Sequence, residues 1–224
     1  GGGLIRHREG GIRVFGDSHG AGRDVVESLA VAPDGSLWVG TATGLMRLRE
    51  DRFEPVAGGA LQGDHVTALE TDAQGQVWIG TRDRGTFVLD GDHPVRLPAA
   101  SDLEDVDVRC LLATRDGALW VGTAGAGLFR WTHQGAERVA SEAVGGSAVE
   151  SLTQDAHGNL WIGTNDEGLL RYSAEGDVAR YGVAQGLSHH RISALHADRE
   201  GNLWIGTFGG GLNRLRDGSF TAFT

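Results

Sequence analysis

Three short segments of the sequence combine the side chains that a binding site for a small polar molecule needs. One is rich in guanidinium groups, one carries carboxylates and an amide, and one offers an aromatic ring. Such a mixture can bind sugars or small organic acids, although the same residues would also suit ordinary solvated turns. The candidate ligand-binding residues are Arg82, Asp83, Arg84, Asn165, Asp166, Glu167, Phe208 and His190.

Histidines and acidic residues raise the question of a metal site. His189 and His190 are adjacent and His196 follows. Neighbouring residues on a strand point to opposite faces, so this pair could share an ion only from a loop. An acidic cluster alternates in the sequence but lacks the ligand spacing of an EF-hand. We expect charged surface loops in both places and no metal. The acidic cluster comprises Asp102, Glu104, Asp105 and Asp107.

No catalytic motif is present. The sequence has no G-x-S-x-G elbow, H-E-x-x-H pair, P-loop or C-x-x-C motif. Cys110 has no neighbour that would activate a thiolate, so we expect a buried structural cysteine. We therefore expect a chain that is not an enzyme and needs no cofactor.

Composition excludes several other classes. The formal net charge is −10 and no Lys/Arg run occurs, whereas a nucleic-acid binder is expected to show a basic stripe. No apolar stretch is long enough for a membrane-spanning helix, so a membrane would be reached only through segments outside this sequence. Glycine is abundant, at 37 of 224 residues, which suits many tight turns between short strands.

A tryptophan repeat organises the whole chain. Near-identical segments, SLWVGT, QVWIGT, ALWVGT, NLWIGT and NLWIGT, are separated by 40, 42, 41 and 43 residues. A glycine stands three residues before each tryptophan, and Gly-Thr follows two residues after it. A period of about 40 residues is that of a propeller blade. The repeated tryptophans are Trp38, Trp78, Trp120, Trp161 and Trp204.

Each repeat can be divided into four strands, A to D. In the second repeat we predict strands over residues 66–71, 76–81, 86–90 and 94–97, with a turn over 72–75. In that turn Asp72 would accept backbone hydrogen bonds and Gly75 would supply a positive φ. Helical periodicity is absent. The tryptophan of strand B should fill the wedge between blades, and the glycine two residues later should leave room for a neighbour.

The blade count is uneven. Residues 1–20 read as the outer C–D hairpin of a half blade, and five complete blades follow in one propeller region. A lone hairpin needs a partner, because an open arc would expose apolar faces. Three explanations stay open: the chain is a fragment of a larger ring of about seven blades, which we favour; two copies complete each other; or five blades close with the leading hairpin displaced. The expected blades span 21–62, 63–105, 106–147, 148–189 and 190–224.

The repeat resembles the two-component regulator propeller family. The pattern is clearest from Gln185-Gly186-Leu187-Ser188 through Gly201-Asn202-Leu203-Trp204-Ile205-Gly206-Thr207 to Gly211-Leu212-Asn213-Arg214. The first repeat departs from it at Ala32, the third at Thr114 and the second at Thr86. The resemblance implies an extracytoplasmic sensor of a bacterial membrane receptor, with a histidine kinase or a diguanylate cyclase as output.

Three functions follow as hypotheses. The first is a periplasmic, non-catalytic sensor module that binds a small molecule or an oligosaccharide. Its partners would be the remaining blades and output module of the same receptor, with a homodimer as a further possibility. The second is a propeller lyase that acts on a cyclic peptide with a metal. The third is a passive protein-interaction scaffold. The variable B–C and D–A connections, on one face of a propeller, are the expected binding loops.

Overall fold

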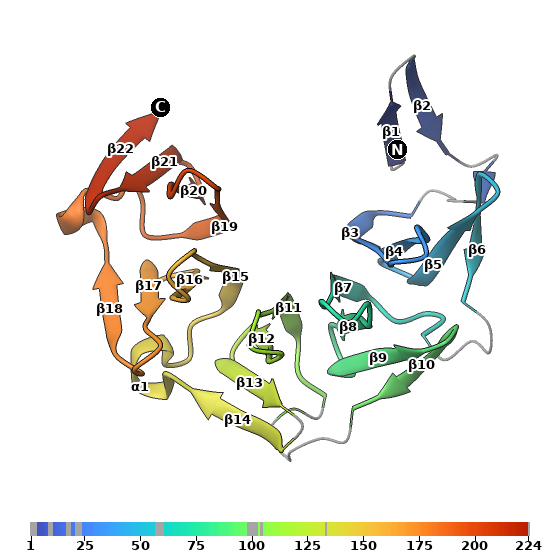
Figure 1. Ribbon diagram of the computed structural model, residues 1–224, viewed down its shortest axis with the longest axis horizontal. Coiled ribbons are helices and arrows are strands. Elements are labelled where there is room, and N and C mark those ends of the chain that lie inside the picture. The colour runs from blue at the N-terminus through green and yellow to red at the C-terminus, as the bar shows by residue number, and fades with distance from the viewer. Residues whose placement is uncertain are drawn as a thin grey trace. The chain divides into compact units, whose positions relative to one another are not determined.

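The computed structural model describes residues 4–8, 11–16, 19, 20, 24–56, 61–97, 103, 105–132 and 134–223. The chain divides into two compact units, Gly1–Val108 and Arg109–Thr224, and the boundary falls at the start of strand β11. Each described sheet is a meander in which strands pair in chain order, as Figure 1 shows. The predicted all-β propeller architecture of four-stranded antiparallel blades is confirmed.

The first unit holds a two-stranded hairpin and two four-stranded blades. The hairpin consists of β1 (Leu4–Arg8) and β2 (Gly11–Phe15); blade 1 consists of β3 (Val26–Val31), β4 (Leu37–Thr41), β5 (Gly44–Arg49) and β6 (Arg52–Pro55); blade 2 consists of β7 (Val66–Thr71), β8 (Val77–Thr81), β9 (Thr86–Asp90) and β10 (His93–Arg96).

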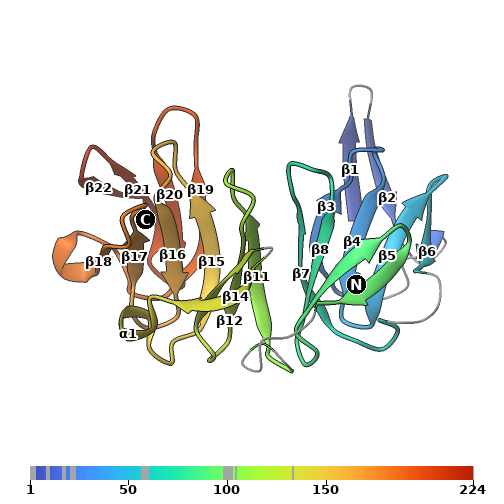
Figure 2. The ribbon, with the colours of Figure 1, turned by 60° about the horizontal axis from the view of Figure 1, so that its bottom comes forward.

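The second unit holds three blades, whose inner strands lie side by side in Figure 2. Blade 3 consists of β11 (Val108–Ala113), β12 (Leu119–Thr123), β13 (Leu128–Thr132) and β14 (Gly135–Val139); blade 4 of β15 (Val149–Gln154), β16 (Leu160–Thr164), β17 (Leu169–Tyr172) and β18 (Val178–Tyr181); blade 5 of β19 (Ile192–Ala197), β20 (Leu203–Thr207), β21 (Gly211–Arg216) and β22 (Ser219–Phe223).

Short helical turns interrupt two D–A connections. Helix α1 (Ser141–Val144) follows blade 3, and a 3₁₀ turn at Val183–Gln185 follows blade 4. A single turn is too short to leave a 3.6-residue pattern in the sequence, so neither was predicted. In blade 2 the observed strands match the predicted ones to within one residue, as expected for element ends.

The A–B turns form as the Asp and Gly residues predict. Oδ1 of Asp72 accepts hydrogen bonds from the backbone N–H of Gln74 (3.0 Å) and Gln76 (2.9 Å). Gly75 lies at φ +85°, a conformation that only glycine adopts without strain. This turn brings strand B back beside strand A, which fixes the register of the inner pair of strands.

The hydrophobic core lies between blades. Trp38 of β4 clusters with Val66, Leu69 and Ile79 of blade 2, and Trp161 of β16 clusters with Ile192, Leu203 and Ile205 of blade 5. The predicted wedge position of the tryptophan is confirmed there. Truncation of such a buried aromatic side chain to Ala costs about 3–5 kcal/mol, so each wedge is a main source of stability. Trp38, Trp120 and Trp161 are buried, while Trp78 and Trp204 are partly exposed.

The glycine of each W-x-G-T segment lies where two blades come closest. A Cβ on Gly40 would lie 2.7 Å from Cγ1 of Val66, and one on Gly163 would lie 2.6 Å from Cγ2 of Ile192. Both neighbours open strand A of the following blade and are fully buried. The glycine therefore makes room for the adjacent blade, as the sequence predicts.

The N-terminal hairpin packs one face on blade 1. The ring of Phe15 is fully buried, 5.8 Å from the ring of Phe53, and belongs to a cluster with Val39. Asp51 joins the hairpin to blade 1 by ion pairs to Arg6 (3.2 Å) and Arg13 (2.5 Å). The hairpin thus takes the place of an outer strand pair. Its other face exposes Ile5, Ile12 and Val14.

Candidate functional site

The B–C loops are fixed at both ends by a buried threonine hydroxyl. Thr81 donates from Oγ1 to the carbonyl of Gly85 (2.8 Å), and Thr164 donates in the same way to Gly168 (2.8 Å). Each hydroxyl also accepts a hydrogen bond from an N–H group of the loop. In blade 4 this N–H belongs to Glu167, and its nitrogen lies 2.9 Å from Oγ1 of Thr164. The predicted binding loops therefore have a rigid backbone, on which the variable side chains are displayed.

Backbone hydrogen bonds join the B–C loops of blades 2, 4 and 5 to the end of the D–A connection that precedes strand A of the same blade. The N–H of Arg82 donates to the carbonyl of His65 (3.0 Å), and that of Phe208 donates to Arg191 (2.9 Å). The N–H of Asn165 bonds Ala148 in the same way. The two sets of variable loops thus lie at one edge of each of these blades.

In blade 2 the candidate residues differ in how far they are already engaged. Arg82 and Asp83 are exposed. Arg84 is half-buried: its Nη1 pairs with Oδ2 of Asp64 (2.6 Å), and its guanidinium lies 5.2 Å from the ring centre of Phe87. Arg84 therefore braces the loop against the D–A connection. Asp64, which sequence reasoning did not single out, is the partner that makes this possible.

In blade 4 two of the three candidates are held by the chain itself. Asp166 accepts a hydrogen bond from the hydroxyl of Ser147, and Glu167 forms an ion pair with Arg180 of β18. Asn165 differs, because its side-chain oxygen is buried and finds no hydrogen-bond partner among the residues that the structure describes. An orphaned acceptor of this kind costs stability unless something donates to it, so Asn165 is the residue of this loop most suited to meet a ligand.

In blade 5 the candidate residues form an aromatic and cationic group. Phe208 is 61% exposed, and the guanidinium of Arg191 lies 4.4 Å from its ring centre. The rings of His189 and His190 stack at 4.4 Å, and the N–H of Arg191 donates to Nδ1 of His189 (3.0 Å). The pair lies in a loop and not on a strand. Arg191 was missed in the sequence, although its place directly before strand A marks it as a loop end.

Blades 4 and 5 bring two candidate segments to the same edge. Gly163 and Ile192 are in contact, as described above. The loop 165–167 starts just after Gly163, and the segment 189–191 ends just before Ile192. Asn165, His190 and Phe208 therefore belong to one edge of the second unit. Arg82, Asp83 and Arg84 belong to the first unit and form a group with Asp64 and His65.

The residues weighed as metal ligands are placed as follows. Within the described residues, no three His, Cys, Asp or Glu side chains come together as a metal site would require. Asp102 and Glu104 of the acidic cluster lie outside those residues, and Asp105 pairs with Arg96 (2.8 Å). Cys110 is partly buried and its Sγ donates to the carbonyl of Val149 (3.4 Å); burial raises the pKa of this thiol.

A second row of polar residues follows the A–B turns. The indole N–H of Trp161 donates to Asp155 (2.9 Å), and that of Trp204 donates to Asp198 (2.8 Å). Hydrogen bonds, first of all from Asn202, lower the pKa of Asp198 to about 2. Partial burial raises the pKa of Asp155, but its hydrogen bonds outweigh burial and leave the pKa below its usual value.

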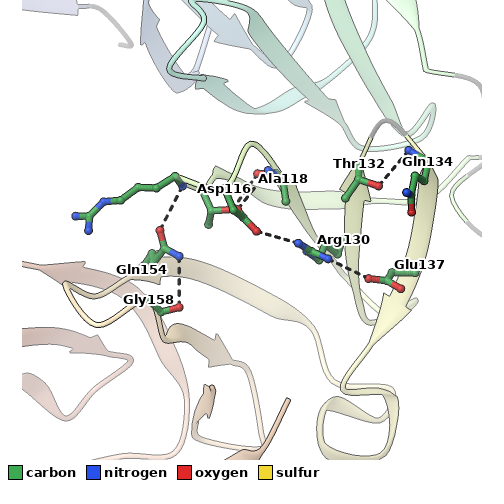
Figure 3. A network of polar contacts seen from close by, with 10 residues as sticks. Asp116, Ala118, Arg130, Thr132, Gln134, Glu137, Gln154 and Gly158 are labelled. Atoms are coloured by element: carbon green, nitrogen blue, oxygen red, sulfur yellow. Dashed lines mark hydrogen bonds and ion pairs between the residues drawn. The ribbon is translucent and has the colours of Figure 1, made fainter. Parts of the chain in front are cut away.

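The repeats that depart from the pattern replace this aspartate with a different arrangement. Blade 1 has Ala32 and blade 3 has Thr114 at the position of Asp155, and each carries an aspartate two residues later. In blade 3 that residue, Asp116, pairs with Arg130 (2.8 Å), whose guanidinium lies 5.9 Å from the ring centre of Trp120. Figure 3 shows Arg130 between Asp116 and a second acid, Glu137.

The third residue that differs from the repeat pattern is Thr86 of blade 2. Thr86 opens β9 where the other repeats have leucine, and it is 5% exposed. Its hydroxyl is buried and has no hydrogen-bond partner in the described part of the chain. Nothing else in blade 2 explains why a threonine stands there.

Comparison with known proteins identifies the repeat. Four segments match the family described as "Two component regulator propeller": residues 60–83, 102–125, 144–166 and 186–209. Each match covers the end of a D–A connection, strands A and B, and the start of a B–C loop. No curated protein matches the chain. In the described parts, no helix has the length and apolar composition needed to cross a membrane.

Solved structures share the fold. The extracellular domain of the putative hybrid two component system BT3049 of B. thetaiotaomicron is 19% identical, with a TM-score of 0.78 over 99% of this chain and 34% of that chain. The extracellular domain of the putative one component system BT4673 of the same organism is 24% identical, with a TM-score of 0.68 over 85% of this chain and 27% of that chain.

The fold is shared with an enzyme as well. Virginiamycin B lyase from Staphylococcus aureus is 14% identical, with a TM-score of 0.74 over 99% of this chain and 76% of that chain. At such identities the likeness is one of fold. The chain spans about a third of the length of the first receptor domain and about a quarter of the second. Four repeats of this chain therefore match the two-component regulator propeller family, on the propeller fold that the solved structures share.

Proposed function

We propose that this chain is a non-catalytic, ligand-sensing propeller module of a bacterial signal-transduction receptor. The family assignment supports this function, and so do the similar structures that are extracellular domains of two component and one component systems. By the same reasoning we propose a periplasmic location. The partners would be the remaining blades and the output module of the same receptor, and a second copy of the chain.

The observation that carries the ligand-binding part of the proposal is the exposed ring of Phe208. An aromatic ring held on a rigid loop offers an apolar face on which a ligand ring can stack. Arg191 beside the ring and His190 close by supply hydrogen-bond donors, and Asn165 offers an unpaired acceptor at the same edge. An apolar face with a few convergent polar groups suits a sugar ring, so we propose an oligosaccharide or a small polar molecule as ligand.

Signalling would follow from differential binding. A ligand can shift the balance between two receptor states only by its difference in affinity for them. A ligand that contacts blades 4 and 5 together would bind the two states with different affinities. The two loop segments belong to adjacent blades, so the affinity would depend on how these blades pack against each other.

The test is a titration of the chain with a panel of oligosaccharides, followed by calorimetry. Phe208→Ala should weaken binding by roughly 10-fold or more, since loss of a central aromatic contact costs 2 kcal/mol or more. Phe223→Ala is the matched control, because Phe223 is also exposed, at 45%, but lies on β22, outside the B–C and D–A loops. Saturable binding to no sugar, or equal losses in both variants, would contradict the ligand site and favour the passive scaffold.

The receptor assignment has its own test. The gene that encodes this chain should also encode a membrane-spanning segment and a kinase or cyclase output module. A gene product without either would refute the receptor role, whatever the sugar titration shows. The likeness to the lyase is one of fold, and we propose no enzymatic activity.

A further inference from the structure

A pocket lies between blades 4 and 5, at the end of the strands opposite to the candidate loops. Its volume is about 160 Å³. Trp161, Tyr181, Leu203 and Leu215 form an apolar wall, and Arg171 of β17 supplies a cation. The A–B turns of both blades and the C–D turn of blade 5 complete it. The pocket combines this apolar wall with charged groups, among them Arg171, Arg216 and Asp217, and such a combination is typical of a small-ligand site.

The internal repeat shows what this arginine normally binds. Arg47 of blade 1 stands opposite Trp38 on strand C, as Arg171 stands opposite Trp161. Arg47 pairs with Asp34 of its own A–B turn (2.8 Å) and with Asp92 in the C–D turn of blade 2 (2.5 Å). Its guanidinium is thus bound by carboxylates from both blades that flank the equivalent pocket.

Blade 3 repeats the arrangement with one change. Arg130 pairs with Asp116 of its A–B turn (2.8 Å) and with Glu137 opposite it on strand D (3.5 Å), as Figure 3 shows. Across these blades the carboxylates come from three places: the third residue of the A–B turn, the strand D residue facing the arginine, and the C–D turn of the next blade.

In blade 4 none of the three places supplies an acid that pairs with Arg171. His157 stands at the third position of the A–B turn, and Ala179 faces Arg171 on β18. In the C–D turn of blade 5, Gly218 stands at the position of Asp92, and the neighbouring Asp217 is exposed and lies 3.6 Å from Nε of Arg216. Within the described residues, Arg171 makes no hydrogen bond or ion pair, and its Nε is buried without a partner. Arg171 is half-buried, and an unpaired Nε in such a place costs stability, so this site lacks an anion that Arg47 and Arg130 have.

The pocket lining includes the carboxylates of Asp155, Asp198 and Asp217. Asp217 is exposed and lies beside Arg216, and the other two are already saturated with hydrogen bonds. Asp155 accepts four hydrogen bonds, from two backbone N–H groups, Asn159 and Trp161. Asp198 accepts four in the same way, from its own turn, Asn202 and Trp204. Neither has an acceptor site left for Arg171. Their charges remain, however, and would repel a ligand with more than one negative charge.

We propose that this pocket binds a small organic monocarboxylate, with its carboxylate on Arg171 and its body against Trp161 and Tyr181. Guanidinium and carboxylate are complementary in shape, and they form short, charge-assisted hydrogen bonds. The volume resembles that of an engineered cavity of about 150 Å³ that holds benzene in another protein. A benzoate-sized acid therefore matches both the wall and the charge. This site is separate from the proposed sugar site and does not depend on it.

The experiment is a titration of the full chain with benzoate, followed by NMR and by tryptophan fluorescence, with benzamide as the neutral analogue. Benzoate should bind saturably and benzamide should not. Arg171→Gln should weaken benzoate binding roughly 10- to 100-fold, the range for loss of a charged hydrogen bond. Arg130→Gln is the matched control and should leave the affinity unchanged, because Arg130 already has its acids.

A second variant supplies the missing acid from within. His157→Asp places a carboxylate where blades 1 and 3 carry Asp34 and Asp116, so it should occupy Arg171 and abolish benzoate binding while the melting temperature is kept or raised. This result separates loss of the site from loss of the fold. Absence of saturable benzoate binding, equal binding of benzamide, or unchanged affinity in Arg171→Gln would each overturn the proposal.

Discussion

The chain with Gly163→Ala should unfold at a lower temperature than the native chain, because the substitution disturbs the contact between blades 4 and 5. The new Cβ would lie 2.6 Å from Cγ2 of Ile192, about 1 Å inside the optimal separation of two carbon atoms, and also 2.6 Å from Oγ of Ser151 on strand A of the same blade. Overpacking of this kind costs about 1–3 kcal/mol. Replacement of glycine by alanine also restricts the unfolded chain, which returns about 0.4–1 kcal/mol. We therefore expect a net loss of about 1–2 kcal/mol.

The fifth blade provides the matched control. Gly206 occupies the same place in its W-x-G-T segment, and among the described residues a Cβ there would meet nothing closer than 3.4 Å. Gly206→Ala should therefore be neutral or slightly stabilising. For a chain of this size each kcal/mol shifts the melting temperature by about 2–4 °C. Thermal unfolding should thus show a drop of roughly 2–8 °C for Gly163→Ala and none for Gly206→Ala.

A double-mutant cycle checks that Ile192 is the cause. When Ile192→Ala has removed Cγ2, Gly163→Ala should cost less than it does alone, with a coupling energy of about 1 kcal/mol or more. Equal shifts for the two glycine variants, or simple additivity of Gly163→Ala and Ile192→Ala, would refute the argument that the glycine makes room for the next blade.

Three further predictions concern polar groups. Asp155→Ala leaves the indole N–H of Trp161 without its acceptor and should cost about 1–3 kcal/mol in urea unfolding; an unchanged midpoint would rule this out. Asp198 has its pKa lowered from 3.8 to about 2, so the stability it contributes is present above pH 3.8 and is lost as the pH falls toward 2. Melts across this range should be less pH-dependent in Asp198→Asn, and identical profiles would contradict the assignment. Thr164→Val removes the hydroxyl that bonds Gly168 and should cost about 1 kcal/mol, with faster amide exchange in loop 165–167; unaltered exchange would mean that the loop is held otherwise.

The architecture could be predicted from the sequence because its strongest signals are local. The Trp-x-Gly-Thr segment and the Asp or Gly of the preceding turn fix strands A and B within a few residues of each other. The glycine that faces Val66 or Ile192 is needed for a contact between two blades. It nevertheless stands at a fixed distance from the tryptophan in every repeat, so it can be recognised from the sequence of a single repeat.

The partners of the candidate residues could not be predicted in the same way. Asp64 reaches Arg84, Ser147 reaches Asp166, and Arg191 covers Phe208. Each pair joins a B–C loop to a D–A connection, and those connections vary in length and composition from repeat to repeat. Their meeting depends on how the blade brings the two loops together, which no spacing in the sequence states.

The replacement of one acid by another was also hidden. Ala32 and Thr114 stand where other repeats have a turn aspartate, so the sequence suggests that the carboxylate is lost. In the structure, Asp34 and Asp116 supply a carboxylate two residues later, and each pairs with an arginine. Only the arrangement in space shows that these are two alternatives for the same corner of a blade. Within the described residues, the same comparison shows that Arg171 of blade 4 and Arg214 of blade 5 have no acid partner.

The threonine hydroxyl that closes each of these B–C loops holds loops of different sequence in the same way. Thr81 and Thr164 hold three-residue segments of equal length by the same bond to the carbonyl four residues on. Residues 82–84 and 165–167 could therefore be exchanged, or filled with randomised sequence, without redesign of the blade beneath them. A library of chains that differ only in these loop residues would vary the side chains available for binding and keep the same scaffold. This fold would then be a starting point for engineered binders.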